Sequence, residues 1–416
     1  MKQKESRKGG TMIKEKSTVP RLRFPGFTDA WKQRKLGEYF VERLECSAEG
    51  ELLSVTISDG VRRFSELGRK DNSSEDKTKY KVLKQGDIVY NSMRMWQGAS
   101  GYSIYDGIVS PAYTVLIPTY LSYALFFSYL FKRSSSLQIF QVNSQGLTSD
   151  TWNLKYKPFS NIVFPAPTLP EQEAIGNFFS DLDQLITLHQ RKLDDVKELK
   201  KALLQKMFPK GNGNDFPELR FPEFTDAWKQ RKLGEVSKRV TRRNKELISS
   251  LPLTISAQHG LVDQEEFFNK QVASKDVSSY YLIKKGEFAY NKSYSNGYPW
   301  GAIKRLDRYE MGVLSTLYIV FKPTSLICSD YLVSYYDTVN WYKEVSMIAA
   351  EGARNHGLLN IAPNDFFKTR LFIPTLPEQE AIGSFFSDLD QLITLHQRQL
   401  DHLKLLKKAL LQQMFI

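Results

Sequence analysis

The residues best suited to chemistry in this sequence lie in two short polar loops, not in a catalytic cluster. The loops read NSMRMWQGASG at 91–101 and NKSYSNGYPWG at 291–301, and each follows a short apolar run. Both combine amide, hydroxyl, basic and aromatic side chains. Amides can pair with the edge of adenine, and Arg or Lys with guanine, so these residue types suit contact with DNA bases. The alternative is an ordinary surface loop whose Trp packs back onto the core.

Smaller polar clusters add further candidates, and we take all of them as predicted DNA-contacting residues. In the first half they are Arg62, Arg63, Asn91, Ser92, Arg94, Trp96, Gln97, Gln145 and Thr148. In the second half they are Gln258, His259, Asn291, Lys292, Tyr294, Asn296, Tyr298, Trp300, Arg354, Asn355 and His356. The basic segments 31–35 and 228–232 are identical to each other. They therefore suit a framework role or phosphate contact better than base reading.

Signatures of catalysis and of metal binding are missing from the sequence. It contains no HExxH, no CxxC pair and no P-loop. The acid pairs at 181/183 and 388/390 are two residues apart on predicted helices, so they do not share a face. We expect them to be solvated helix charges and not a nuclease centre. The sequence thus predicts no catalytic residue, no metal site and no cofactor in this chain, and favours a recognition or scaffolding role.

Composition permits a nucleic-acid partner without establishing one. The formal net charge is +12, but the first 21 of the 416 residues hold seven Lys or Arg and two Glu, which accounts for +5. The remainder of the chain is only mildly basic. The longest mainly apolar run, 120–131, is shorter than the roughly 20 residues that a membrane span needs. We expect a cytoplasmic protein with no membrane segment.

The chain repeats itself over about half its length. LRFPGFTDAWKQRKLGE at 22–38 recurs at 219–235 with one difference, and 167–208 recurs at 374–415 with 36 of 42 positions identical. Between these copies the similarity falls to fragments such as a shared Thr-Ile-Ser, at 56–58 and 254–256. A fixed framework with a variable interior predicts two halves that do the same job on two different targets.

The second repeated segment predicts a long helix with an apolar seam. Its apolar positions alternate in steps of four and three, which is the heptad pattern of a coiled coil. They are Leu182, Ile186, His189, Leu193, Val196, Leu203 and Met207, with Lys200 interrupting the series. The second copy repeats the pattern with Lys407 at the interruption. Some 38 residues would form a rod of about 57 Å. The twin helix of the same chain, packed antiparallel, is the simplest partner, and pairing between two chains is the alternative.

His189 and His396 occupy matching positions on this seam. A paired-histidine metal site is conceivable there. A polar residue that fixes the register of the coiled coil is the better interpretation, because nothing nearby in the sequence completes a metal shell.

The tandem LRFPxFTDAWKQRKLGE segments, the GDIVYN-type turn in each variable region and the repeated PTLPEQEAIGxFFSDLDQLITLHQR helix resemble the specificity subunit of type I restriction–modification systems. The resemblance implies an α+β fold with two tandem target-recognition domains of mixed α/β structure. Pseudo-two-fold symmetry would relate these domains, and two long antiparallel coiled-coil helices would separate them. The expected segments are a basic disordered tail (1–21), domain 1 (22–170), spacer helix 1 (171–208), a linker (209–218), domain 2 (219–377) and spacer helix 2 (378–416).

The same resemblance implies the partners. Each domain would read one half of a split double-stranded DNA site, and two methylation subunits and the restriction subunits would dock on the chain. S-adenosylmethionine, ATP and Mg²⁺ would belong to those partner subunits. Two alternatives remain: a stand-alone DNA methyltransferase or nuclease, and a coiled-coil scaffold that binds only proteins. The missing cofactor loop and carboxylate cluster count against the first, and the divergent polar loops on a fixed framework count against the second.

Overall fold

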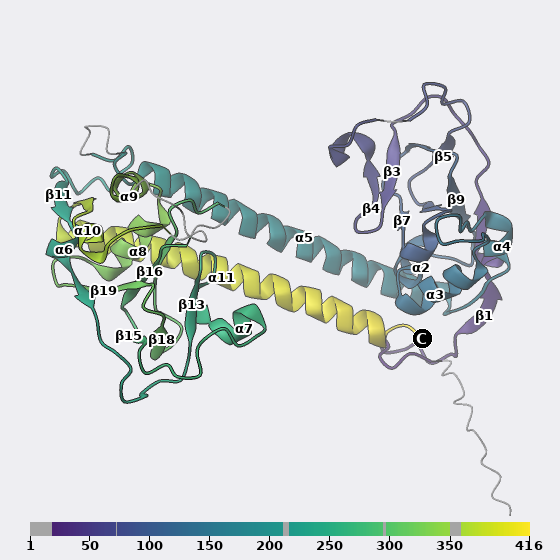
Figure 1. The fold of residues 1–416 in the computed structure, drawn as a ribbon. Helices are drawn as coiled ribbons and strands as arrows, with labels where there is room; N and C mark the ends of the chain where they lie inside the picture. The colour runs from purple at the N-terminus through teal and green to yellow at the C-terminus, as the bar shows by residue number, and fades with distance from the viewer. Residues whose placement is uncertain (1–18, 72, 211–215, 294–296, 350–358) are drawn as a thin grey trace, which may run out of the picture. The chain divides into compact units, whose positions relative to one another are not determined.

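The repeated segments form the two longest helices of the described chain, α5 (Leu169–Lys206) and α11 (Leu376–Gln413) (Figure 1). The computed structural model describes residues 19–71, 73–210, 216–293, 297–349 and 359–416. The predicted basic tail therefore lies outside the described residues, apart from its last three positions. Pro follows the first residue of both helices, where its missing N–H costs no hydrogen bond.

Contacts divide the chain into two units, and the boundary falls inside both long helices. The first unit comprises residues up to Gln190 together with Arg398–Ile416, and the second comprises Arg191–Gln397. Each unit therefore contains one variable region and parts of both long helices.

The described residues of the first unit form ten strands and several short helices before α5. Its strands are β1 (Lys32–Lys35), β2 (Phe40–Glu42), β3 (Leu53–Thr56), β4 (Gly60–Arg63), β5 (Lys81–Leu83), β6 (Ile88–Asn91), β7 (Ser100–Tyr102), β8 (Gly107–Val109), β9 (Tyr113–Pro118) and β10 (Val163–Ala166). Its helices are α1 (Leu36–Tyr39), α2 (Ala124–Phe131), α3 (Ser134–Asn143) and α4 (Tyr156–Ser160), with 3-10 turns η1 (Phe64–Leu67) and η2 (Met95–Gln97).

The second unit follows the same order. Its strands are β11 (Lys229–Lys232), β12 (Ser237–Val240), β13 (Leu253–Ser256), β14 (Gly260–Asp263), β15 (Tyr281–Lys284), β16 (Phe288–Asn291), β17 (Ala302–Arg305), β18 (Met311–Leu314), β19 (Ile319–Pro323) and β20 (Arg370–Ile373). Its helices before α11 are α6 (Leu233–Val236), α7 (Gln264–Phe268), α8 (Ser329–Asp337), α9 (Tyr342–Ile348) and α10 (Pro363–Phe366).

The two units share one sheet topology despite their divergent sequences. A four-stranded sheet of order β2-β9-β6-β7 is matched by β12-β19-β16-β17, and the antiparallel pairs β1-β10, β3-β4 and β5-β8 are matched by β11-β20, β13-β14 and β15-β18. Antiparallel sheets with separate helices make this an α+β fold, as predicted. The variable regions therefore differ in side chains and loops and keep the same framework.

The hairpin register shows why the sequences were hard to align. Strand β3 spans Leu53–Thr56 and β13 spans Leu253–Ser256, so the shared Thr-Ile-Ser falls two residues later in the first hairpin than in the second. The glycine that ends each turn fixes this register, because Gly60 (φ 68°) and Gly260 (φ 75°) adopt a left-handed conformation that favours glycine. The tripeptide match is therefore a coincidence of composition, and our pairing of it was wrong.

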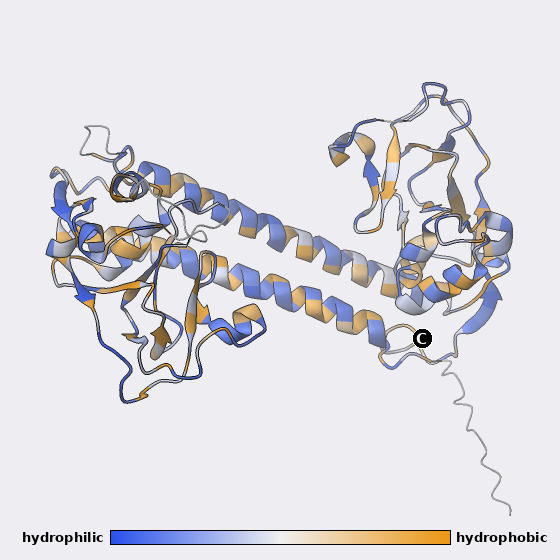
Figure 2. Cartoon of the chain, viewed as in Figure 1, coloured by the Kyte–Doolittle hydropathy of each residue, from blue (hydrophilic) through white to orange (hydrophobic). Residues whose placement is uncertain are grey.

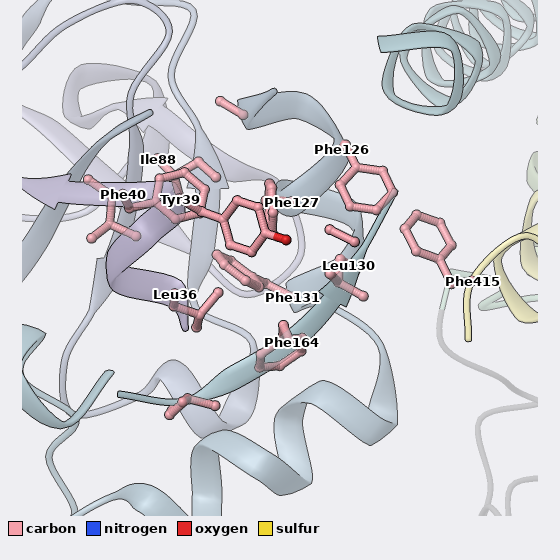
Figure 3. Close-up of a cluster of buried hydrophobic side chains, with 14 of the residues drawn as sticks. Leu36, Tyr39, Phe40, Ile88, Phe126, Phe127, Leu130, Phe131, Phe164 and Phe415 are labelled. Atoms are coloured by element: carbon pink, nitrogen blue, oxygen red, sulfur yellow. The ribbon is translucent and has the colours of Figure 1, made fainter. Parts of the chain in front are cut away.

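Aromatic side chains fill the core of the first unit. Phe126 and Phe127 of α2 pack with Phe40 of β2, and Phe415, just after α11, stacks on Phe126 with a centroid distance of 5.2 Å (Figure 3). Phe208, just after α5, takes the same place in the second unit against Tyr331. Each long helix thus ends by inserting a phenylalanine into an aromatic core.

The repeated LRFPxFTDAWKQRKLGE segment, here called the framework motif, anchors each unit to the first turn of a long helix. Arg23 donates two hydrogen bonds of 2.6 Å to the buried carboxylate of Glu171, and Arg220 donates two of 2.7 Å to Glu378. The next residue, Gln172, accepts a hydrogen bond from the backbone N–H of Tyr123 at 2.9 Å. Gln379 repeats this contact in the second unit. The repeated Pro-Glu-Gln of the sequence is therefore a docking motif as well as a helix start.

The long helices pack antiparallel within each unit. Hydrophilic and hydrophobic residues alternate along both of them (Figure 2). In the first unit Lys407 of α11 contacts Asp183 of α5 at 2.5 Å, and in the second Lys200 of α5 contacts Asp390 of α11 at 2.7 Å. The seam lysines thus meet aspartates of the opposite helix. The expectation that these two aspartates are only solvated helix charges was wrong, because antiparallel pairing brings a lysine to each of them.

Candidate nucleic-acid interface

The loop between β6 and β7 is held by its own side chains. The Asn91 amide oxygen accepts the backbone N–H of Met93 at 3.0 Å, and the Trp96 indole donates to the Met93 carbonyl at 3.1 Å. Ser92 is buried and shares a 2.9 Å hydrogen bond with Thr114. The Ser92 hydroxyl therefore supports the loop from below and is not available to a ligand, which removes it from the set of surface candidates.

Arg94 and Gln97 remain at the surface of this loop. The Arg94 guanidinium donates to the Gln97 side-chain oxygen at 3.1 Å, which holds the two groups side by side. A guanidinium next to an amide can offer donors and an acceptor to a base edge. Trp96 packs edge-to-face on Trp152 with a centroid distance of 5.1 Å, so it shapes the loop.

The β3–β4 hairpin carries Arg62 and Arg63 in exposed ion pairs. Arg62 contacts Glu66 at 3.2 Å, and Arg63 contacts Glu51 at 3.3 Å and lies over the Tyr105 ring. Exposed ion pairs of this kind contribute about 0–1 kcal/mol, so a phosphate can displace the carboxylates at low cost. Both arginines are therefore able to contact DNA.

Three of the predicted clusters come together in the first unit. Strand β4 packs beside β7, which begins where the 91–101 loop ends. The segment with Gln145 and Thr148 folds back on the same loop, since the Leu154 N–H donates to the Ser92 carbonyl at 2.8 Å. Gln145 and Thr148 are exposed there. The candidates of the first unit, Ser92 excepted, thus line neighbouring elements.

In the second unit the corresponding loop is more tightly packed. Lys292 donates to the Ile361 carbonyl at 3.3 Å, and burial lowers the pKa of its ammonium group. Trp300 packs against the core, and its carbonyl accepts the Tyr290 hydroxyl at 2.7 Å. The Trp300 side chain is partly buried, and its packing on the core resembles the alternative of a Trp that folds back.

The other candidates of the second unit divide into exposed and undescribed residues. Gln258 and His259 are exposed in the β13–β14 turn, and Tyr298 is partly exposed. The Asn291 side chain accepts the Ser293 N–H at 3.0 Å, as Asn91 does for its own loop. Five candidates lie outside the described residues: Tyr294, Asn296, Arg354, Asn355 and His356.

Sequence reasoning missed the pair that fixes the turn before each loop. Asp87 accepts two hydrogen bonds from Arg43, at 2.8 and 3.0 Å, and Glu287 accepts one from Arg242 at 2.7 Å. Each acid also accepts the backbone N–H three residues before it. The signal was present as an acid after the turn glycine in both halves. The Arg–acid pair holds the turn that precedes the β6–β7 loop and the β16–β17 loop.

Comparisons with known proteins agree with this geometry. Residues 30–198, which include β1 to β10 and most of α5, match the type I restriction modification DNA specificity domain. The first half of the chain is thus similar to the specificity domain of type I restriction–modification systems. The resemblance inferred from the sequence motifs is therefore confirmed.

Two relatives come from Methanocaldococcus jannaschii. The putative type I restriction enzyme MjaX specificity subunit is 26% identical over 231 residues, or 50% of this chain and 48% of that protein. The MjaVIII specificity subunit is 26% identical over 174 residues, or 38% of this chain and 39% of that protein. The chain thus aligns with less than half the length of either relative.

A solved structure shares the fold over nearly the whole chain. The type I restriction–modification S subunit from M. genitalium superposes with a TM-score of 0.58 at 14% identity, covering 96% of this chain and 99% of that one. In the part of the chain described here, no helix is long and apolar enough to cross a membrane.

Proposed function

We propose that this chain is the DNA-recognition subunit of a type I restriction–modification complex, and that each unit reads one half of an asymmetric, bipartite site. One observation carries the proposal: two units with the same sheet topology present different side chains on corresponding loops, in a family defined by DNA specificity. Two units with the same fold and different loop side chains suit a DNA site whose two halves have different sequences.

Recognition would combine two kinds of contact. Exposed Lys and Arg neutralise phosphates and supply an affinity that is independent of sequence and falls with salt. Arg94 with Gln97, and the hairpin side chains Arg62 and Arg63, would then read base edges in the first half-site. Gln258 and His259 would take the corresponding place in the second. The paired long helices would set the length of the gap between the half-sites. The bases within that gap would not be contacted for their sequence.

The chain itself would be non-catalytic and would direct partner subunits. The long helices support this, because leucines recur at exposed positions outside the seam: Leu185 and Leu188 on α5, and Leu392 and Leu395 on α11. Exposed apolar positions repeated on a framework suit two copies of one partner. We assign that role to the methylation subunits, which would bring S-adenosylmethionine. Restriction subunits would bring ATP and Mg²⁺.

A genome-wide map of methylated adenine tests the proposal directly. Cells that co-express this chain with its neighbouring methylation subunit should show one split, asymmetric motif with a fixed gap. A palindromic motif would contradict the assignment of different half-sites to different units. Absence of methylation, with a folded and bound partner, would favour the protein-binding scaffold.

The spacer role has its own test. Inserting four residues into α5 and four at the equivalent position of α11 adds about 6 Å to each helix. At about 3.4 Å per base pair, the gap in the methylation motif should lengthen by one to two base pairs. An unchanged gap with retained methylation would show that the helices do not set the spacing.

A further inference from the structure

A pocket of about 640 Å³ in the first unit is lined by basic side chains from distant parts of the chain. Its basic residues are Lys132, Arg133, Lys404, Lys407 and Lys408. Two carboxylates, Asp59 and Asp183, also line it. The β3–β4 turn, the end of α2 and the last turns of α11 thus enclose one basic space.

Close backbone packing places the hairpin against this pocket. A Cβ atom on Gly101 of β7 would lie 2.9 Å from the Gly60 Cα atom and 2.9 Å from the Val61 nitrogen. No side chain fits in that space, so glycine at this position lets the hairpin lie directly on β7. The hairpin turn then reaches the end of α2, where the Lys132 ammonium donates to the Ile57 carbonyl at 3.0 Å.

The cations of the pocket are only partly neutralised. Lys407 is paired with Asp183, which also accepts the Tyr129 hydroxyl at 2.8 Å. Among the described residues, no carboxylate oxygen lies within 4.0 Å of the Lys132 ammonium. Burial lowers the pKa of the Lys132 ammonium group and the charge of nearby Lys407 lowers it further; together they outweigh the opposite effect of Asp59 and Asp183. An anion in the pocket would relieve this repulsion.

In the second unit a carboxylate of the chain neutralises the corresponding lysines. Lys132 lies nine residues after Tyr123, whose backbone N–H binds Gln172. Asp337 lies nine residues after Cys328, whose backbone N–H binds Gln379, so Lys132 and Asp337 occupy equivalent positions. Asp337 contacts Lys200 at 2.9 Å and Lys304 at 2.7 Å. Lys304 occupies the strand position that corresponds to Gly101. Here a carboxylate of the protein sits among the lysines, so no external anion is needed.

We propose that the basic pocket of the first unit binds a phosphate group of the DNA backbone, and that the second unit has no equivalent site. The proposal rests on the proposed function, since the ligand is the DNA that the unit would read. Lysine ammonium groups bind phosphate as point charges. Lys404 and Lys408 are exposed on α11, and the only side-chain partner that Lys404 shows among the described residues is the neutral Gln190, at 3.4 Å. The adjoining hairpin carries Arg62 and Arg63, so the phosphate contact would fix that hairpin relative to the duplex.

The test compares matched lysine pairs on the repeated helix. Lys404→Ala with Lys408→Ala removes pocket lysines, and Lys197→Ala with Lys201→Ala removes their counterparts in the second unit. All four side chains are exposed, so folding should be unaffected. Binding of a mixed-sequence duplex to the chain in complex with its co-expressed methylation subunit is measured by fluorescence anisotropy from 50 to 200 mM salt.

In the pocket variant, loss of one phosphate contact should make the negative slope of log K against log salt shallower by about 0.9. Between 50 and 200 mM salt, the affinity of that variant should therefore fall by a factor about 3 to 4 times smaller than the affinity of the wild type. The control pair should keep the wild-type slope. Lys132→Ala should act like the pocket pair, and Lys132→Arg should restore the slope.

Four outcomes separate the possibilities. A slope reduced only by the pocket variants supports the proposal, whereas equal losses from both pairs, or no loss, overturn it. If the pocket variants lose binding of inorganic pyrophosphate but keep the DNA slope, the pocket serves a free phosphate ligand and the assignment to DNA is wrong. If the wild-type complex binds no DNA, the proposed function fails together with this inference.

Discussion

Replacing Glu378 by Gln tests whether the framework motif anchors the second unit to its long helix. The Glu378 side chain is fully buried and accepts two hydrogen bonds of 2.7 Å from Arg220. The Trp228 indole N–H adds a third at 3.3 Å. The glutamine keeps the volume of the side chain but removes its charge and turns an N–H₂ group toward the guanidinium.

The expected cost follows from the burial of both partners. Removing one member of a buried ion pair costs about 3–5 kcal/mol, because the remaining charge stays desolvated and unpaired. The Arg220 side chain is 13% exposed and keeps some contact with water, so we expect a loss near the lower limit of that range. For a unit of this size, that corresponds to a fall in Tm of about 6–12 °C.

Thermal unfolding followed by circular dichroism measures this effect. Glu380→Gln is the matched control, because Glu380 lies two residues away on the same helix and is exposed; its Tm should change little. Glu171→Gln should reproduce the loss in the first unit, since Arg23 holds Glu171 in the same way. Equal Tm values for the Glu378 and Glu380 variants would refute the anchoring role.

Three further results are expected. Gly383→Ala should lower the urea midpoint even though Ala favours a helix by about 1 kcal/mol, because its Cβ would lie 2.6 Å from a backbone nitrogen of α8 and overpacking costs about 1–3 kcal/mol. A double-mutant cycle of Asp183→Asn and Lys407→Met should give a coupling of about 0.5–1 kcal/mol, since exposures of 40% and 24% leave the pair screened. Burial raises the pKa of Asp337, but its two lysine partners outweigh burial and hold that pKa below 3.8. The stability from this group is therefore present above about pH 4 and is lost as the pH falls through the lowered pKa, so Asp337→Asn should reduce the loss of Tm measured between pH 5 and pH 2.

The sequence by itself determined the two long helices, their seam and the tandem framework. These features depend on periodicity and on local signals, which a single chain displays openly: a Pro-Glu helix start, apolar residues every three or four positions, and a repeat with 36 of 42 identities. Antiparallel pairing with the twin helix was the simplest arrangement that the sequence offered, and the structure was needed to choose it over pairing between two chains.

Only the tertiary structure decided which polar residues reach the surface. Ser92 and Trp300 have the composition of a binding loop, yet one is buried under Thr114 and the other packs on the core. Asp183 seemed solvated from its helix position, but antiparallel packing brought Lys407 to it. Burial depends on what the rest of the chain places above a side chain, and residue type and spacing do not encode that.

The basic pocket makes the same point most clearly. Asp59, Lys132 and Lys408 are widely separated in sequence and share no motif. They meet because glycine at position 101 lets the hairpin approach β7 and because α11 returns to pack beside α5. The sequence determined which charges the chain carries, and the fold decided which of them lie together with too few counter-charges, because electrostatic interaction depends on distance in the folded chain and not on separation along it.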